Sequence, residues 1–316
     1  MALLDPSSVR IDGPWTHRDV HANGIRFHIA EVDGRGPGRA GPLVLLLHGF
    51  PEFWWSWRHQ LSGLAHSGAR VVAVDLRGYG DSDKPPRGYD GWTLAGDVAG
   101  LIRALGETSA VLVGHDWGGL IAWSTAALHP RLVRGLAVLA APHPVALRRA
   151  LRRPGGQGHG GQGRALRYAV GYQLPWWPER RLPAENGAEV ERVLRRWSGP
   201  AWSQSGEFAE VAVRNRAAMQ IPGVVHSAME YYRWAMRSQL RSDGHRFRVA
   251  VDKPVSVPVL QLHGALDACL LPATAVDSAT WAPDREFHLL DGIGHFVHQE
   301  AAAETTRLLA AFLSSL

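Results

Sequence analysis

Short apolar runs of strand length alternate with helix-length stretches over most of this 316-residue chain. The runs consist largely of Val, Leu and Ala, which is typical of strands buried on both faces of a sheet. They are Pro42–Leu47, Arg70–Val74, Ala110–Gly114, Gly135–Ala140, Val257–His263 and Glu286–Leu290. The stretches long enough for helices are Phe53–His66, Trp92–Leu105, Trp117–His129 and Gln299–Ser315. The alternation predicts an α/β fold with a mostly parallel sheet flanked by helices.

The segment from Val145 to Val251 has a different character. It is rich in Arg and aromatic residues and contains no run that resembles a buried strand. We therefore predict a core built from residues 1–144 and 252–316. Residues 145–251 would form a helical lid inserted after a strand end, where α/β sheets place their ligand sites. Near its start, the glycine-dense stretch Arg152–Arg164 predicts a surface loop.

The positive charge of the chain invites a nucleic-acid interpretation, which the sequence does not otherwise support. The net charge is +5 and the sequence pI is about 9.8. The cations are nearly all Arg and are scattered, apart from a group at positions 148, 149, 152 and 153, and no nucleic-acid module accompanies them. We interpret them as a solvated surface and expect no nucleic-acid partner.

The single cysteine, Cys269, excludes an intramolecular disulfide framework and a cysteine-based zinc site. It favours a reduced compartment, and we expect the cytoplasm. The first residues, MALLDPSSVR, lack the basic and apolar regions of a secretory signal. The apolar runs are also far shorter than the roughly 20 residues of a membrane span, so we expect no membrane association.

The stretch Val111–Leu120, VLVGHDWGGL, has the pattern of a nucleophile elbow between a strand and a helix. Small residues flank the central residue because the turn is tight and its backbone is strained. Here the central residue is Asp116. A carboxylate is a poor acyl-transfer nucleophile, but it can displace a leaving group at a saturated carbon and form an ester with the enzyme. The alternative is that Asp116 only caps the following helix.

Hydrolysis of such an ester requires an oxyanion hole, a base and a group that orients the base. His48-Gly49-Phe50-Pro51 follows a predicted strand directly, so the amides of Phe50 and Trp117 are the expected donors; an ordinary Gly-Pro turn is the alternative. His295 follows the last predicted strand, and Asp267 follows the strand before it. We predict His295 as the base and Asp267 as its partner, although a histidine-rich chain also permits a structural role.

These residues resemble those of the soluble epoxide hydrolases of the α/β-hydrolase fold. The resemblance covers nearly the whole chain and rests on HGFPEFWWSWRHQ, DLRGYGDSDKP, GHDWGG and GHF, together with the acid at position 267. Haloalkane dehalogenases share the first three motifs, so the motifs alone leave the substrate open.

The lid distinguishes the two groups of enzymes. In the family that the chain resembles, two lid tyrosines protonate the epoxide oxygen. Tyr168 lies five residues before Gln173 in a Tyr-x₄-Gln-x-Pro context, and Tyr232 lies in an aromatic-Tyr-Arg context. The resemblance implies that both are catalytic, the alternative being that they are core aromatics, as we expect for Tyr172 and Tyr231. A phenol suits an alkoxide leaving group because it can donate a proton and stays protonated at neutral pH.

We accordingly predict an enzyme that converts an epoxide and water to a vicinal diol, without metal or cofactor. The alternatives are a haloalkane or haloacid dehalogenase with the same nucleophile, and a non-catalytic ligand-binding protein. The chain has 13 Trp, an excess that predicts an aromatic-lined pocket and an apolar or aromatic substrate. The expected substrate contacts are Phe50, Trp117, Trp176 and Trp177, and the oligomeric state, monomer or homodimer, stays open.

Overall fold

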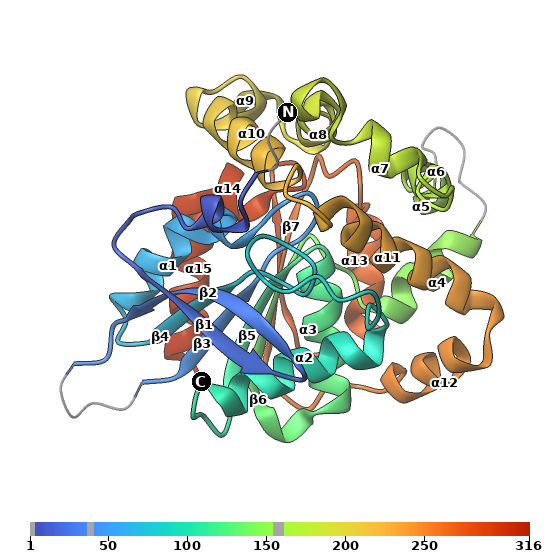
Figure 1. The fold of residues 1–316 in the computed structure, drawn as a ribbon. Helices are drawn as coiled ribbons and strands as arrows, with labels where there is room; N and C mark the ends of the chain where they lie inside the picture. The colour runs from blue at the N-terminus through green and yellow to red at the C-terminus, as the bar shows by residue number, and fades with distance from the viewer. Residues whose placement is uncertain (1–3, 37–40, 154–160) are drawn as a thin grey trace.

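An eight-stranded sheet lies at the centre of the computed structural model, which describes residues 4–36, 41–153 and 161–316. The strands follow the spatial order β1-β2-β4-β3-β5-β6-β7-β8 (Figure 1). Their bounds are β1 (Thr16–Ala22), β2 (Ile25–Asp33), β3 (Leu43–Leu47), β4 (Arg70–Val74), β5 (Ala110–His115), β6 (Val133–Leu139), β7 (Val259–Gly264) and β8 (Glu286–Leu290). All neighbours from β4 to β8 in this order are parallel, which confirms the predicted α/β fold with a mostly parallel sheet.

Every predicted strand is present, with ends that differ from the prediction by at most two residues. Every residue of β3, β4, β5 and β7 is buried, as the continuous apolar runs indicated. Because parallel strands end at the same edge, the loops after β3, β5, β7 and β8 gather at one edge of the sheet.

The first two strands form an antiparallel hairpin that the sequence analysis did not predict. In β1 polar residues are exposed on most positions, so no continuous apolar run marks it. Asn23 and Gly24 connect the two strands with positive φ angles of 45° and 80°. An Asn-Gly pair between two strands is the usual signal of such a turn, and it was available in the sequence.

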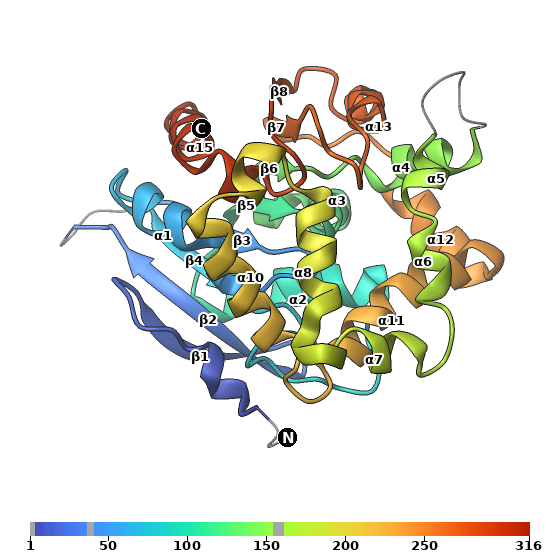
Figure 2. The ribbon, with the colours of Figure 1, turned by 90° about the horizontal axis from the view of Figure 1, so that it is seen from above.

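The core helices cover both faces of the sheet. In Figures 1 and 2, α1 and α15 lie on one face, and α2 and α3 lie on the other. Their bounds are α1 (Arg58–Ala65), α2 (Gly91–Ala104), α3 (Trp117–Leu128) and α15 (Ala302–Ser314), with the shorter α13 (Pro272–Val276) and α14 (Val297–Glu300). The single-turn 3-10 helices are η1 (Pro6–Val9), η2 (Trp54–Trp57), η3 (Pro130–Leu132), η4 (Ser238–Leu240) and η5 (Asp277–Thr280). None of the helices in the described ranges combines the length and the apolar character needed to cross a bilayer.

Nine α-helices, together with the 3-10 helix η4, separate β6 from β7 in the described part of the chain. They are α4 (Pro144–Arg152), α5 (Gln162–Ala165), α6 (Tyr168–Gly171), α7 (Trp177–Arg181), α8 (Ala184–Trp197), α9 (Pro200–Ser203), α10 (Gly206–Ala218), α11 (Val224–Arg237) and α12 (Ser242–Val251). Viewed from above, α8 and α10 cross in front of the sheet (Figure 2). We call this segment the lid; its division from the core at residues 145 and 251 stays a prediction. Residues 154–160, the centre of the predicted glycine-rich loop, lie outside the described residues.

Candidate active site

Asp116 occupies the sharp turn between β5 and α3. Its φ of 48° and ψ of −115° are strained for a residue with a side chain. The turn is so tight that a Cβ at Gly118 would lie 2.1 Å from the Leu47 carbonyl oxygen, and a Cβ at Gly114 would lie 2.4 Å from that of Gly118. The Asp116 side chain makes no helix-capping hydrogen bond, so the capping alternative does not explain the residue. Its carboxylate instead faces the loops after β3 and β8.

The two carboxylate oxygens of Asp116 have different neighbours. The Phe50 amide donates to Oδ2 at 3.0 Å, while Oδ1 lies 3.9 Å from Nε2 of His295. Gly49 allows this approach because a Cβ there would lie 2.5 Å from the Cβ of Asp116. Burial raises the pKa of Asp116. This rise is partly offset by groups that lower the pKa, namely the histidines His295 and His115 and the amides of Phe50 and Trp117. The geometry therefore puts Oδ2 at the Phe50 amide and leaves Oδ1 facing the histidine.

His295 lies in the loop after β8 and is fully buried. Its Nδ1 is 2.8 Å from Oδ2 of Asp267, in the loop after β7. Asp267 is held in turn, because its Oδ1 accepts hydrogen bonds from the amides of Cys269 and Leu270 at 2.8 and 2.9 Å. The distance of 3.9 Å from Nε2 to Asp116 is too long for a direct hydrogen bond and suits one bridging water.

The charges of this trio depend on one another. Burial alone lowers the pKa of His295, but the carboxylates of Asp267 and Asp116 raise it to about 9. Burial favours a neutral Asp267, yet His295 and His263 hold its pKa well below the ordinary value. His295 is therefore an imidazolium between two carboxylates at neutral pH, and it would lose one of these partners if Asp116 became an ester.

Two tyrosines face Asp116 from the lid. Tyr168 on α6 and Tyr232 on α11 line the same cavity as the carboxylate. The Tyr168 hydroxyl lies 3.4 Å from the Cys269 thiol, and the Tyr232 ring packs edge-on against Trp117 with a centroid distance of 4.9 Å. Burial raises the pKa of both phenols well above the ordinary value, so both stay protonated at neutral pH. Tyr231, by contrast, donates its hydroxyl to the Arg77 carbonyl at 2.8 Å and points away from the cavity, as expected.

The loop that carries His295 contacts the lid through a short stretch of backbone. We call this contact, between residues 197–199 and residues 294–300, the seam. The His295 amide donates to the Trp197 carbonyl at 2.8 Å, at the end of α8. Glu300 accepts from the amides of Gly199 and Gly294 at 2.7 and 2.8 Å and from that of Phe296 at 2.9 Å. Gly294 fits because a Cβ there would lie 2.4 Å from backbone atoms of Trp197 and Gly199.

A second buried cluster lies beneath the nucleophile. Glu52 contacts Nδ1 of His115 at 2.8 Å and Nε2 of His298 at 3.2 Å. Nε2 of His115 lies 3.0 Å from the His295 carbonyl oxygen, so the cluster connects the loops after β3, β5 and β8. Its three side chains place possible ligand atoms within 4.8 Å of one another, which makes it the one candidate metal site among the described residues. The 2.8 Å contact is that of a hydrogen bond, and we interpret the cluster as structural.

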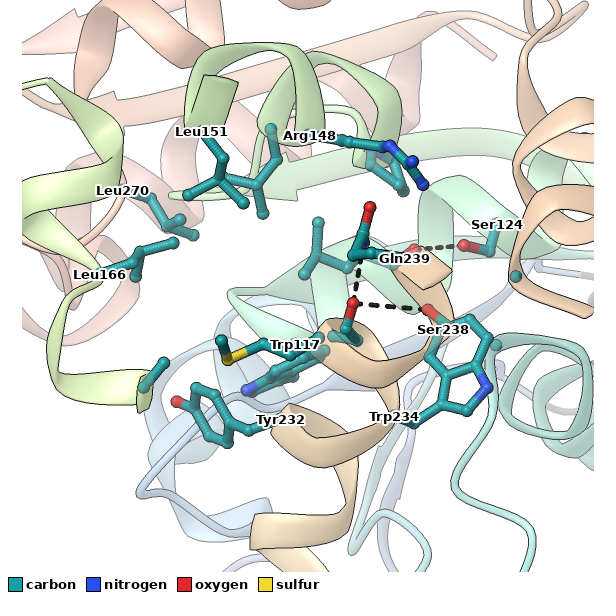
Figure 3. A pocket seen from close by; sticks show the side chains of 18 of the residues that line it. Trp117, Ser124, Arg148, Leu151, Leu166, Tyr232, Trp234, Ser238, Gln239 and Leu270 are labelled. Carbon is teal, nitrogen blue, oxygen red and sulfur yellow. Dashed lines mark hydrogen bonds between the residues drawn. The ribbon is translucent and has the colours of Figure 1, made fainter. Parts of the chain in front are cut away.

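The cavity above Asp116 has a volume of about 430 Å³, large enough for an organic ligand. Trp117, Tyr232, Trp234, Leu166 and Leu270 are among its lining residues (Figure 3). The predicted substrate contact through Trp117 therefore fits. Three other expected contacts do not line this cavity.

Trp176 is 71% exposed. Trp177 is 43% exposed and lines a separate cavity within the lid. The Phe50 ring is fully buried and packs against Tyr232. The cavity lining therefore does not support these three contacts, and the number of tryptophans in a chain does not say where each one points. Trp54 and Trp55 are buried in the core and do not line the cavity.

Sequence reasoning missed two participants. Cys269 was not predicted as a site residue, although the sequence places it two residues after Asp267. Glu300 was missed entirely, because its bond to Gly199 joins residues 101 positions apart.

Comparison with known proteins gives consistent results. Residues 42–302 match the family model described as alpha/beta hydrolase fold. Epoxide hydrolase B of Mycobacterium tuberculosis is 31% identical over 95% of this chain and 98% of the relative. Epoxide hydrolase 3 of Xenopus tropicalis is 34% identical over 92% of this chain and 75% of the relative. Among solved structures, the epoxide hydrolase VrEH1 from Vigna radiata has 29% sequence identity and a TM-score of 0.74. The superposition covers 96% of this chain and 99% of the VrEH1 chain.

Proposed function

The chain belongs to the α/β-hydrolase-fold family and to the epoxide hydrolases within it, and we propose that it opens the epoxide ring through a covalent ester on Asp116. The observation that carries this mechanism is the arrangement around that carboxylate. One oxygen accepts a hydrogen bond from the Phe50 amide, the other faces a histidine, and two protonated tyrosines line the cavity above them.

In the first half-reaction, Oδ1 of Asp116 attacks a ring carbon and displaces the epoxide oxygen. The developing alkoxide accepts a hydrogen bond and then a proton from Tyr168 or Tyr232. A strained ring with an alkoxide leaving group needs such an acid, and general acid catalysis of this kind contributes roughly 10²- to 10⁴-fold. The product is a hydroxyalkyl ester in which Oδ2 is the carbonyl oxygen.

In the second half-reaction, water attacks the carbonyl carbon of Asp116. Formation of the ester removes the negative charge that helped to keep His295 protonated, so the imidazolium gives up its proton, which solvent carries to the tyrosinate, and the neutral ring can then accept a proton from water. The oxyanion then forms on Oδ2, where the Phe50 amide already donates, with the Trp117 amide as the second donor. Collapse passes the second proton of this water to the departing diol oxygen, which releases the diol, restores the Asp116 carboxylate and leaves His295 protonated as at rest, and the net reaction is epoxide plus water to diol.

We further propose an apolar epoxide as the substrate, supported by a lining that consists mainly of Leu, Ile, Val and aromatic side chains. The cytoplasmic location expected from the single cysteine and the oligomeric state stay predictions.

Single-turnover hydrolysis in ¹⁸O-labelled water tests the covalent route. We expect the label in the Asp116 carboxylate, measured on the peptide that contains it, because the diol takes its new oxygen from the enzyme. Label found only in the diol would show direct attack by water and would contradict the ester.

A panel of styrene oxide and haloalkanes tests the reaction class. Diol formation without halide release supports the proposal. Halide release without diol formation would favour the dehalogenase, and saturable binding of styrene oxide without any turnover would favour a binding protein.

A further inference from the structure

The cavity follows one face of α3 away from the nucleophile. Its lining includes Asp116, Trp117, Leu120, Ile121 and Ser124, spacings that repeat with the helical turn. At a rise of 1.5 Å per residue, the distance along the axis from Asp116 to Ser124 is about 12 Å. Figure 3 shows Tyr232 and Trp117 toward one end and Arg148 and Ser124 toward the other.

Two arginines lie on the cavity-facing sides of the helices at that far end. Arg148 on α4 lines the cavity together with Leu147 and Leu151, and Arg248 on α12 lines it with Phe247 and Val251. The helices α4 and α12 pack against each other and against α3. Arginines at positions with apolar neighbours on the inner face of a helix are unusual unless a partner neutralises them.

No such partner is present in the described part of the chain. Among the described residues neither Arg148 nor Arg248 forms an ion pair, and the residues left out, 1–3, 37–40 and 154–160, contain no Asp or Glu. Nε of Arg148 is buried without a hydrogen-bond acceptor in the described structure. The charged groups that perturb Arg148 are Arg248 and Arg152, both positive, and the only carboxylate that lines the cavity in its described part is Asp116 at the other end.

The serine hydroxyls and the glutamine amide at this end are already paired. The hydroxyls of Ser124 and Ser238 donate to the carbonyls of Leu120 and Ala235 at 2.7 and 3.4 Å, and the Gln239 amide also donates to Ala235, at 2.8 Å (Figure 3). Among the described side chains, Arg248 has one hydrogen-bond contact, to the ring of His245 at 2.6 Å. Arg148 and Arg248 therefore supply charged donors at this end of the cavity, and the third lining arginine, Arg167, lies beside Tyr168.

We propose that Arg148 and Arg248 form an anion subsite. With the proposed function as its basis, the substrate is then an epoxide on an apolar chain that ends in an anionic group. The reacting ring lies at Asp116, the chain lies along α3, and the carboxylate or phosphate lies between the two guanidinium groups. Both arginines are partly exposed, so the charged end stays near water while the chain is buried. Guanidinium groups suit this role because they bind carboxylate and phosphate with two parallel hydrogen bonds.

The kinetic test compares epoxystearic acid, in which the epoxide lies in mid-chain, with its methyl ester. The two compounds differ only in the charge at the chain end. We expect kcat/KM for the acid to exceed that for the ester by about tenfold, mainly through KM, and the difference to shrink with added salt. Equal kcat/KM values for both compounds would overturn the anion subsite while leaving the proposed function intact.

The variants Arg148→Gln and Arg248→Gln test the residues. Each is expected to reduce the preference for the acid, and the double variant is expected to abolish it, so that the acid and the ester are hydrolysed with equal kcat/KM. Arg148→Lys keeps the charge and should keep part of the preference. Arg246→Gln is the matched control, since this exposed arginine lies on the same helix as Arg248 but does not line the cavity. A double variant that retains the wild-type preference would contradict the proposal.

Binding of non-reactive ligands separates the two proposals. Decanoate, decyl phosphate and decanol can be titrated against the fluorescence of Trp117 and Trp234, which line the cavity. We expect both anions to bind at least about tenfold more tightly than the alcohol, and their ratio shows which anionic group fits better. If no epoxide is hydrolysed but the anions still bind more tightly, the proposed function fails and the subsite stands. Equal binding of all three ligands would refute the subsite.

Discussion

The core and the lid contribute to the same site in different ways. The core groups, Asp116, Asp267 and His295, each follow a strand end and are fixed by hydrogen bonds to backbone amides or to one another. The lid supplies Tyr168 from α6, a helix of four residues, and Tyr232 from α11. Tyr168 has a single weak contact to a thiol at 3.4 Å, and aromatic packing positions both rings.

The core and the lid therefore control two different properties of the enzyme, its reaction steps and its choice of substrate. The core determines that a carboxylate attacks carbon and that water then attacks an ester. The lid determines which leaving group can be protonated and which chain can lie in the cavity. Core variants should therefore stop the reaction at a definite step, whereas lid variants should give graded effects.

The largest effect is expected for Asp116→Ala. Without the carboxylate no ester forms, and kcat/KM should fall by roughly 10⁴-fold or more, as for removal of other covalent nucleophiles. Substrate binding should persist, which equilibrium titration with the fluorescence of Trp117 can measure. Residual turnover within tenfold of wild type would mean that the core nucleophile is elsewhere.

The second effect concerns the base. His295→Gln should reduce turnover by about 10³-fold while leaving ester formation intact, so that intact-protein mass spectra show the enzyme with substrate attached. In the wild type the base must be neutral, so turnover should rise with pH. Its midpoint should lie below the resting pKa of about 9, because the ester removes the charge of Asp116. A flat pH profile, or no accumulated ester in the variant, would contradict the assignment.

The lid tyrosines should show the graded behaviour. Tyr168→Phe or Tyr232→Phe alone should slow ester formation by roughly tenfold, because the other phenol still donates, and the double variant should slow it by about 10²- to 10³-fold. Rapid-quench measurement of the first half-reaction reports this directly. Tyr231→Phe is the matched control because its hydroxyl bonds to the Arg77 carbonyl instead. If one single variant were as slow as the double variant, one tyrosine would be the sole acid.

The smallest effect tests the seam between the two regions. A Cβ in Gly294→Ala would lie 2.4 Å from the lid backbone, so the loop that carries His295 must shift. Because small displacements of catalytic groups are costly, we expect turnover to fall by about tenfold, with the hydrolytic step most affected. Gly206→Ala is the control, since a Cβ there meets nothing within 4 Å. Full activity of the Gly294 variant would show that the seam yields without displacing the base.

The sequence predicted the core better than the lid, for a physical reason. Buried parallel strands appear as continuous apolar runs, and catalytic residues that follow strand ends can be located by counting along the chain. The antiparallel strand β1 was missed because one of its faces is exposed. The orientation of Trp176 and the pairing of Gly199 with Glu300 depend on packing between distant segments, which no local pattern encodes. The meaning of Arg148 also required the structure, since its place among apolar neighbours is not visible in an arginine-rich stretch.

The hydrogen bond from the His295 amide to the Trp197 carbonyl has a consequence for recombination between relatives. A chimaera that exchanges lids at the chain positions where the lid begins and ends would pair the Trp197–Gly199 turn of one parent with the Gly294–Glu300 loop of another. Both sides of this contact are backbone atoms in close approach, so the two segments should be inherited together. Functional crossovers should therefore exchange the final loop together with the lid, although His295 and Trp197 are 98 positions apart in the chain.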